Sequence, residues 1–157
     1  MKKTFIFTFL FVIAALLTIS SCDKTDGISV VPKFSSISCE PTTPAPGDTM
    51  TLTAHQSVHG KLIYSATYKW GFRYFDDILQ RDTTVYRTES VVYDNIGGPD
   101  PQMGFRLPAY STASRLYVTL TASYGLSGQT EQGQIFGQAS TSSTVNINTS
   151  QAKNGAQ

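Results

Sequence analysis

Apolar and polar side chains alternate with a period of two along most of the chain after residue 33. This pattern predicts β-strands, because successive side chains of a strand point to opposite faces. Met50, Leu52 and Ala54 alternate with threonines, so that strand has one apolar face and one hydroxyl-bearing face. Further strands are predicted where the alternation returns, clearly over residues 64 to 74 and 115 to 124, and less regularly over residues 85 to 93, 104 to 107, 134 to 139 and 143 to 147.

These segments amount to about seven strands, separated by clusters of Gly, Pro, Asn and Asp that favour turns. Helical periodicity is almost absent, and no segment repeats with a period of 20 to 50 residues. About seven short strands within about 115 residues are typical of a sandwich of two antiparallel sheets. The pattern therefore predicts an all-β fold, an antiparallel β-sandwich.

Three motifs follow one another in an order that resembles the immunoglobulin-like and PKD-like modules of bacterial surface proteins. A Pro-Gly-Asp turn precedes the strand at residues 50 to 54, Trp70 lies within the next strand, and a Val-Thr-Leu-Thr stretch begins at Val118. The resemblance covers roughly residues 34 to 148 and implies an immunoglobulin-like β-sandwich with Trp70 in its core. The chain departs from the family in having no cysteine pair that could bridge the sheets, since Cys39 has no mate there.

The N-terminus has the features of a secretion signal. Two lysines precede an apolar run of about 15 residues, shorter than the roughly 20 that span a bilayer as a permanent helix. The run ends in Ile19-Ser20-Ser21-Cys22, which resembles the lipobox of bacterial lipoproteins. The resemblance implies cleavage after residue 21 and acyl chains on Cys22, which would anchor the protein firmly in a membrane. The alternative is a secreted protein whose Cys22 has no such role.

Four segments follow from these observations. We expect a lipoprotein signal peptide over residues 1–21, a lipidated Cys22 with a flexible tether over 22–32, the sandwich over 33–148 and a disordered tail over 149–157. Asp23 and Asp26 are compatible with sorting to either membrane of a Gram-negative envelope. We expect the outer membrane, with the domain at the cell surface.

Composition and charge exclude several classes of protein. The 157 residues are 40% hydrophobic and 15% charged, and the formal net charge is +1. This composition is too apolar for a disordered chain. Removal of residues 1–21 takes away Lys2 and Lys3, which leaves 10 basic side chains against 11 acidic ones. A nearly neutral chain does not suit a nucleic-acid partner. With two cysteines, the chain cannot form a zinc site of four cysteines. Lipidation would use Cys22 and leave Cys39 without a partner in the chain, either as a small buried hydrophobe or as a free thiol.

Few residues suggest a metal site. His55 and His59 are the two histidines, but four residues of an extended strand span about 13 Å, too far to share an ion without a turn. Asp94, Asn95 and Asp100 carry the oxygen ligands that calcium prefers, although the glycines and prolines among them also form an ordinary turn. The same two interpretations apply to the acidic loop at Asp76 and Asp77. We expect no resident cofactor.

The sequence also gives little sign of an enzyme. The Gly-Leu-Ser-Gly stretch around Ser127 lacks the last glycine and the helix of a nucleophile elbow. The glutamates, Glu40, Glu89 and Glu131, show no spacing that nominates a catalytic pair. We therefore expect a non-catalytic protein.

Aromatic residues are the feature most open to a binding role. Tyrosine supplies contact area and a hydroxyl, which makes it frequent at recognition surfaces. Tyr68, Trp70 and Phe72 are expected in the core, and four tyrosines nearer strand ends and loops are candidate ligand contacts: Tyr86, Tyr93, Tyr110 and Tyr124.

The sequence thus favours a membrane-anchored cell-surface lipoprotein that acts as a non-catalytic binding or structural module, in adhesion or in a surface complex. Its partner would engage the loops around Asp76 and Asp100 or an open sheet edge. The alternative is a glycan-binding accessory lipoprotein of a polysaccharide uptake system.

Overall fold

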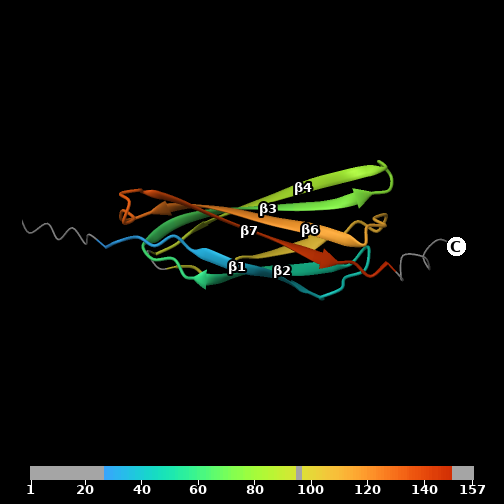
Figure 1. Cartoon of the computed structure of the whole chain (residues 1–157), viewed down its shortest axis with the longest axis horizontal. Coiled ribbons are helices and arrows are strands. Elements are labelled where there is room, and N and C mark those ends of the chain that lie inside the picture. The colour runs from blue at the N-terminus through green and yellow to red at the C-terminus, as the bar shows by residue number, and fades with distance from the viewer. Residues whose placement is uncertain (1–26, 95–96, 150–157) are drawn as a thin grey trace, which may run out of the picture.

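Seven antiparallel strands without an α-helix form the fold of this computed structural model, which describes residues 27–94 and 97–149 (Figure 1). The signal peptide, Cys22, Asn95 and the tail beyond Thr149 lie outside the described residues. In chain order the strands are β1 (Lys33–Glu40), β2 (Thr49–Val58), β3 (Ile63–Asp76), β4 (Arg81–Val92), β5 (Gln102–Arg106), β6 (Arg115–Leu126) and β7 (Phe136–Asn146).

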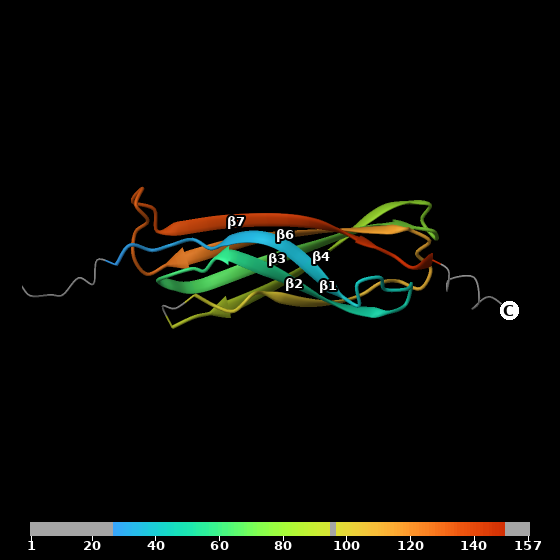
Figure 2. The ribbon, with the colours of Figure 1, turned by 60° about the horizontal axis from the view of Figure 1, so that its bottom comes forward.

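The strands form two sheets, a three-stranded sheet in the order β1-β2-β5 and a four-stranded sheet in the order β4-β3-β6-β7. The predicted all-β, antiparallel, seven-stranded sandwich is confirmed. In the constant-type immunoglobulin arrangement the fourth strand pairs with the fifth. Here β4 pairs instead with β3, which widens the second sheet. Figure 2 shows β1 beside β7, where the two sheets meet at one side.

The core lies between the sheets and is built from the alternating apolar positions. The ring of Trp70 is fully buried, and Phe72 of β3 stacks on Phe105 of β5 with ring centroids 4.0 Å apart. Stacking across the two sheets fixes their separation through large apolar surfaces. The other fully buried hydrophobic side chains of the strands are Met50, Leu52, Ala54, Leu116, Val118, Leu120 and Ala122.

Three details differ from the sequence prediction. The strand β1 was not expected, because its serines and single buried Ile37 give it almost no alternation. The segments predicted at 134 to 139 and 143 to 147 are one strand, β7. The alternation over residues 64 to 74 predicts Tyr64 on the same buried face as Tyr68 and Trp70, but a register shift between Ile63 and Ser65 turns it outward, where it is exposed.

The folded unit also begins earlier than predicted. Ser29 is buried, and its hydroxyl donates a hydrogen bond to the carbonyl of Leu62 at 3.3 Å. Val30 pairs with Lys61, and Val31 packs so closely on Gly137 of β7 that a Cβ there would lie 2.3 Å from Val31 Cγ2. Residues 29–32 therefore belong to the sandwich rather than to the flexible tether that was predicted over 22–32.

Cys39 is partly buried and packs against the core as a free thiol. Burial, and then the charge of Glu40, raise the pKa of its thiol. Across residues 27–94 and 97–149 there is no helix with the length and hydrophobicity to cross a membrane.

Candidate functional site

An open groove runs across the outer face of the four-stranded sheet, the face turned away from the core, and encloses about 540 Å³. Tyr86 of β4, Gly71 of β3 and Thr119 of β6 lie opposite one another across the sheet. In the next row, Arg73 of β3 lies opposite Tyr117 of β6. The hydroxyl-bearing residues of the lining are Thr84, Thr119, Ser142, Ser143 and Thr144.

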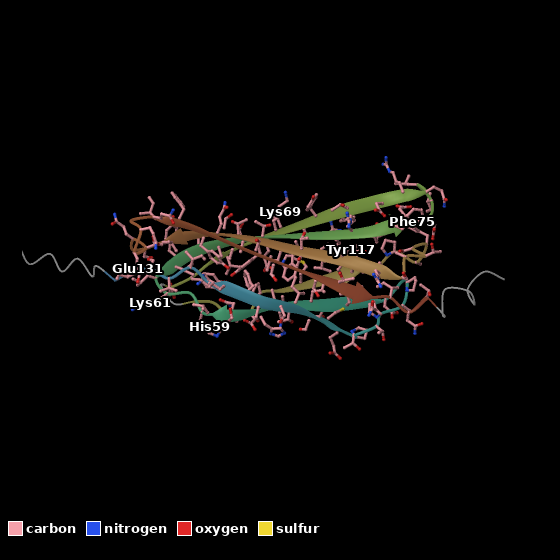
Figure 3. The ribbon with its side chains drawn as sticks, viewed as in Figure 1. His59, Lys61, Lys69, Phe75, Tyr117 and Glu131 are labelled. Carbon is pink, nitrogen blue, oxygen red and sulfur yellow. The ribbon has the colours of Figure 1, made fainter. Side chains whose placement is uncertain are left out.

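Two tyrosine rings stand on this face, and a cation lies over each of them. Tyr86 is 57% exposed, and Nζ of Lys69 lies 4.5 Å from its ring centroid. Tyr117 is 40% exposed, and Cζ of Arg73 lies 4.7 Å from its ring centroid. Cation–π contacts of this kind hold the ring and the charged group in defined positions. Figure 3 shows Lys69 and Tyr117 on the four-stranded sheet, with Lys69 directed away from the other sheet.

Gly71 allows the groove to form. A Cβ at this position would lie 2.6 Å from Oγ1 of Thr119 and 3.1 Å from Cε1 of Tyr86. Because Gly71 has no Cβ, the ring of Tyr86 can extend from β4 over β3 and leave the groove open beside the ring. A ring that covers a strand glycine is also a known way to stabilise a sheet.

The four predicted tyrosines have different environments. Tyr86 lines the groove. Tyr93 is half-buried, shares a hydrogen bond of 3.0 Å with the Tyr68 hydroxyl, and lines a second pocket of about 390 Å³. Tyr110 is exposed in a loop. Burial, and then interaction with Tyr110, raise the pKa of Tyr74 to about 12.

Tyr124 was wrongly placed among the exposed candidates. It is 2% exposed and packs edge-to-face against Tyr68 in the core, with ring centroids 6.1 Å apart. Burial raises the pKa of its hydroxyl. Tyr117 was missed as a ligand contact, although its position on the polar side of the alternation over residues 115 to 124 already indicated an outward ring.

A second cluster lies on the outer side of the three-stranded sheet. The hydroxyl of Ser38 is 2.8 Å from Nε2 of His55, and Nδ1 of His55 is 3.0 Å from Oδ2 of Asp100. The backbone N–H of Gln56 donates to Oδ1 of Asp100 at 2.9 Å. Burial alone would raise the pKa of Asp100, but the hydrogen bonds from Gln56 and His55 lower it below its ordinary value.

The atoms of Ser38, His55 and Asp100 follow the order found in hydrolytic triads. Their setting is different, however. A nucleophile elbow places serine on a sharp turn with backbone N–H donors beside it, whereas Ser38 lies within β1, paired with Thr53 of β2. We interpret the cluster as a network that ties β1, β2 and the loop before β5 together.

A fluorophosphonate probe tests this interpretation. We expect it to leave Ser38 unmodified under conditions that label a serine hydrolase completely, because no turn sets the hydroxyl free for attack. Intact-mass spectrometry of the purified chain measures the modification. An added phosphonate on Ser38 that disappears in a His55→Asn variant would contradict the interpretation and indicate an acyl-transfer site.

Four of the residues considered for metal binding, His55, Asp76, Asp77 and Asp100, have protein partners. Oδ1 of Asp76 accepts hydrogen bonds from the N–H groups of Ile78 and Leu79 at 2.9 and 3.0 Å, which closes the β3–β4 turn. Oδ1 of Asp77 accepts a hydrogen bond from the Thr112 hydroxyl at 2.6 Å. His55 contacts Asp100. In the described part of the chain, no three His, Cys, Asp or Glu side chains gather as a metal site would require.

Comparison with known proteins gives little. No protein-family model matches the chain, and no curated protein sequence matches it. One similar structure is a cycloisomaltooligosaccharide glucanotransferase from Paenibacillus sp. complexed with cycloisomaltoheptaose, at 14% identity and a TM-score of 0.42, covering 74% of this chain and 14% of that one.

Two further structures are similar to the chain. A superoxide reductase (neelaredoxin) from Ignicoccus hospitalis has 10% identity and a TM-score of 0.39, over 82% of this chain and 87% of that one. The sporulation control protein Spo0M from Bacillus subtilis has 17% identity and a TM-score of 0.35, over 75% and 49%. At these identities and scores the similarities carry no information about function.

Proposed function

We propose that this protein is a non-catalytic binding module, held in the outer membrane by lipid on Cys22 and facing the cell surface, and that it binds its ligand in the groove on the four-stranded sheet. The observation that supports this best is the pair of exposed rings, Tyr86 and Tyr117, on either side of Gly71. Each ring offers a ligand in the groove an apolar face and a hydroxyl.

A glycan suits this groove better than a protein does. Sugar rings present apolar C–H faces that stack on aromatic rings, together with hydroxyls that need hydrogen-bond partners, and tyrosine provides both kinds of contact. The remaining lining is mostly serine and threonine, whose hydroxyls both donate and accept. A protein-binding surface would be expected to offer a larger apolar centre.

A protein partner is favoured at another place, the turn between β3 and β4. Ile78 is 71% exposed and Leu79 51% exposed at its tip, on a turn that Asp76 holds in shape. This turn lies at the end of the sandwich opposite the one where the described chain begins (Figure 1). If Cys22 holds the lipid, the tip is the part of the domain furthest from the membrane, where adhesion or assembly contacts would occur.

Binding to a panel of soluble neutral and acidic oligosaccharides tests the glycan proposal. We expect Tyr86→Ala and Tyr117→Ala each to weaken binding about tenfold or more, because loss of an aromatic ring that stacks on a ligand removes on the order of 1–3 kcal/mol where the ligand is a nucleobase. Tyr110→Ala is the matched control and should bind normally, because Tyr110 lies away from the groove lining.

Isothermal titration calorimetry of the full chain in a non-ionic detergent measures the affinities. Failure to bind every oligosaccharide, or binding that survives loss of both rings, would overturn the groove as a glycan site. If Ile78→Ser then abolished attachment of cells to a surface, the protein-partner candidate would take its place.

A further inference from the structure

Charge is unevenly distributed over the sandwich, although the chain as a whole is nearly neutral. The outer face of the four-stranded sheet carries three basic side chains, Lys69, Arg73 and Arg115. Each is paired in register with residues of the neighbouring strands whose side chains also point outward. Asp82 is the acidic residue of that face, at the far end of β4 and one row away from Arg73. Glu89 of β4 lies opposite the buried Tyr68 and therefore belongs to the other side of the sheet.

Lys69 and Arg73 also lack an acidic partner. The one ion pair of the described residues joins His55 to Asp100, on the opposite sheet. Both side chains are exposed and lie over tyrosine rings instead. Arg73 lines the groove itself, so its guanidinium is available to a ligand that stacks on Tyr117.

From this arrangement we infer that the groove selects an acidic glycan, one with hexuronate residues whose carboxylates pair with Arg73 and Lys69 while their rings contact Tyr86 and Tyr117. The inference rests on the proposed glycan-binding function and adds the ligand class to it. A guanidinium donates two parallel hydrogen bonds to a carboxylate, a geometry that fits a uronate better than a neutral sugar. The hydroxyl-rich lining then serves the remaining sugar hydroxyls.

The test compares three uronate hexasaccharides, from polygalacturonate, alginate and hyaluronate, by calorimetry on the full lipidated chain in a non-ionic detergent. The methyl ester of each hexasaccharide is its matched neutral ligand, because it has the same rings without the charge. We expect at least one uronate to bind about tenfold or more tightly than its neutral counterpart, and its affinity to fall as salt is raised.

Variants assign the effect to the groove. Arg73→Gln should weaken uronate binding about tenfold, the value of a charge-assisted hydrogen bond, and should weaken binding of the neutral ester much less, because the ester offers no carboxylate to Arg73. Lys61→Gln is the matched control, since Lys61 is an exposed cation at the far end of the domain (Figure 3). A general structural effect of Arg73→Gln would lower both affinities equally.

The outcomes separate the two proposals. Equal affinity for uronate and ester, with binding still dependent on Tyr86 and Tyr117, would overturn the choice of an acidic ligand and keep the glycan function. Binding of neutral panel members alone would do the same. If no glycan of either kind binds, both proposals fail. They also fail if uronate binding is unchanged in both Arg73→Gln and Tyr86→Ala, because the groove is then not the binding site.

Discussion

Replacing Trp70 with alanine is expected to lower the free energy of unfolding by about 3–5 kcal/mol, the usual cost of removing a large buried aromatic side chain. Trp70 is fully buried in the middle of β3, between β4 and β6, so the strands on either side restrict collapse around the void. A small domain is stable by only about 5–15 kcal/mol. This one substitution would therefore remove a large part of the stability.

Urea unfolding followed by circular dichroism measures the effect, because Trp70 is the only tryptophan and its fluorescence is lost with it. Phe136→Ala is the control, since Phe136 is 65% exposed and should change stability by less than about 1 kcal/mol. Trp70→Phe should cost less than alanine, because it keeps a ring and removes a buried indole N–H that has no partner among the described residues. A loss below about 1 kcal/mol for Trp70→Ala would contradict the central place of this side chain in the core.

Cys22→Ala should abolish acylation completely. The thiol of Cys22 is the expected acceptor of the acyl chains, and an alanine side chain offers no atom for the bond. Cells grown with labelled palmitate should incorporate label into the wild-type chain and none into the variant. Cys39→Ala is the matched control, because Cys39 is partly buried in the sandwich and should leave labelling unchanged.

Protease treatment of intact cells then tests the orientation. If the sandwich faces the medium, peptides from residues 33–148 should be released while the cells remain intact, and mass spectrometry identifies them. Release only after the outer membrane is opened would place the domain in the periplasm and overturn the surface location. Label that persists in Cys22→Ala would overturn the lipid anchor itself.

Most of the fold could be predicted because alternation is a local property. In β6 every second residue from Leu116 to Ala122 is fully buried, as the period-two pattern predicts. β1 was missed for the same reason, since three of its eight residues are serine and only Ile37 is buried, so the alternation is too weak to see. Tyr64 shows a further limit, because the register shift that turns it outward depends on pairing with β6.

The candidate site was predicted only in part. Tyr86 was selected from the sequence, and Tyr117 could have been selected from its place on the polar face. Their proximity could not, because β4 and β6 are separated in the chain and meet only through β3. The same is true of His55 and Asp100, which the sequence offered only as members of two separate loops and which the fold joins in one network.

By itself, the sequence determined most strand faces, the all-β class and the core around Trp70, since each depends on neighbouring residues. The anchor at Cys22 rests on a short motif and stays a prediction. The tertiary structure decided which outward side chains share a surface: Tyr86, Gly71, Arg73 and Tyr117 form one groove only because β4 pairs with β3 rather than with β5. It also decided that Tyr124 is buried and that residues 29–32 join the domain. Strand pairing depends on contacts between distant segments, and local patterns along the chain do not encode them.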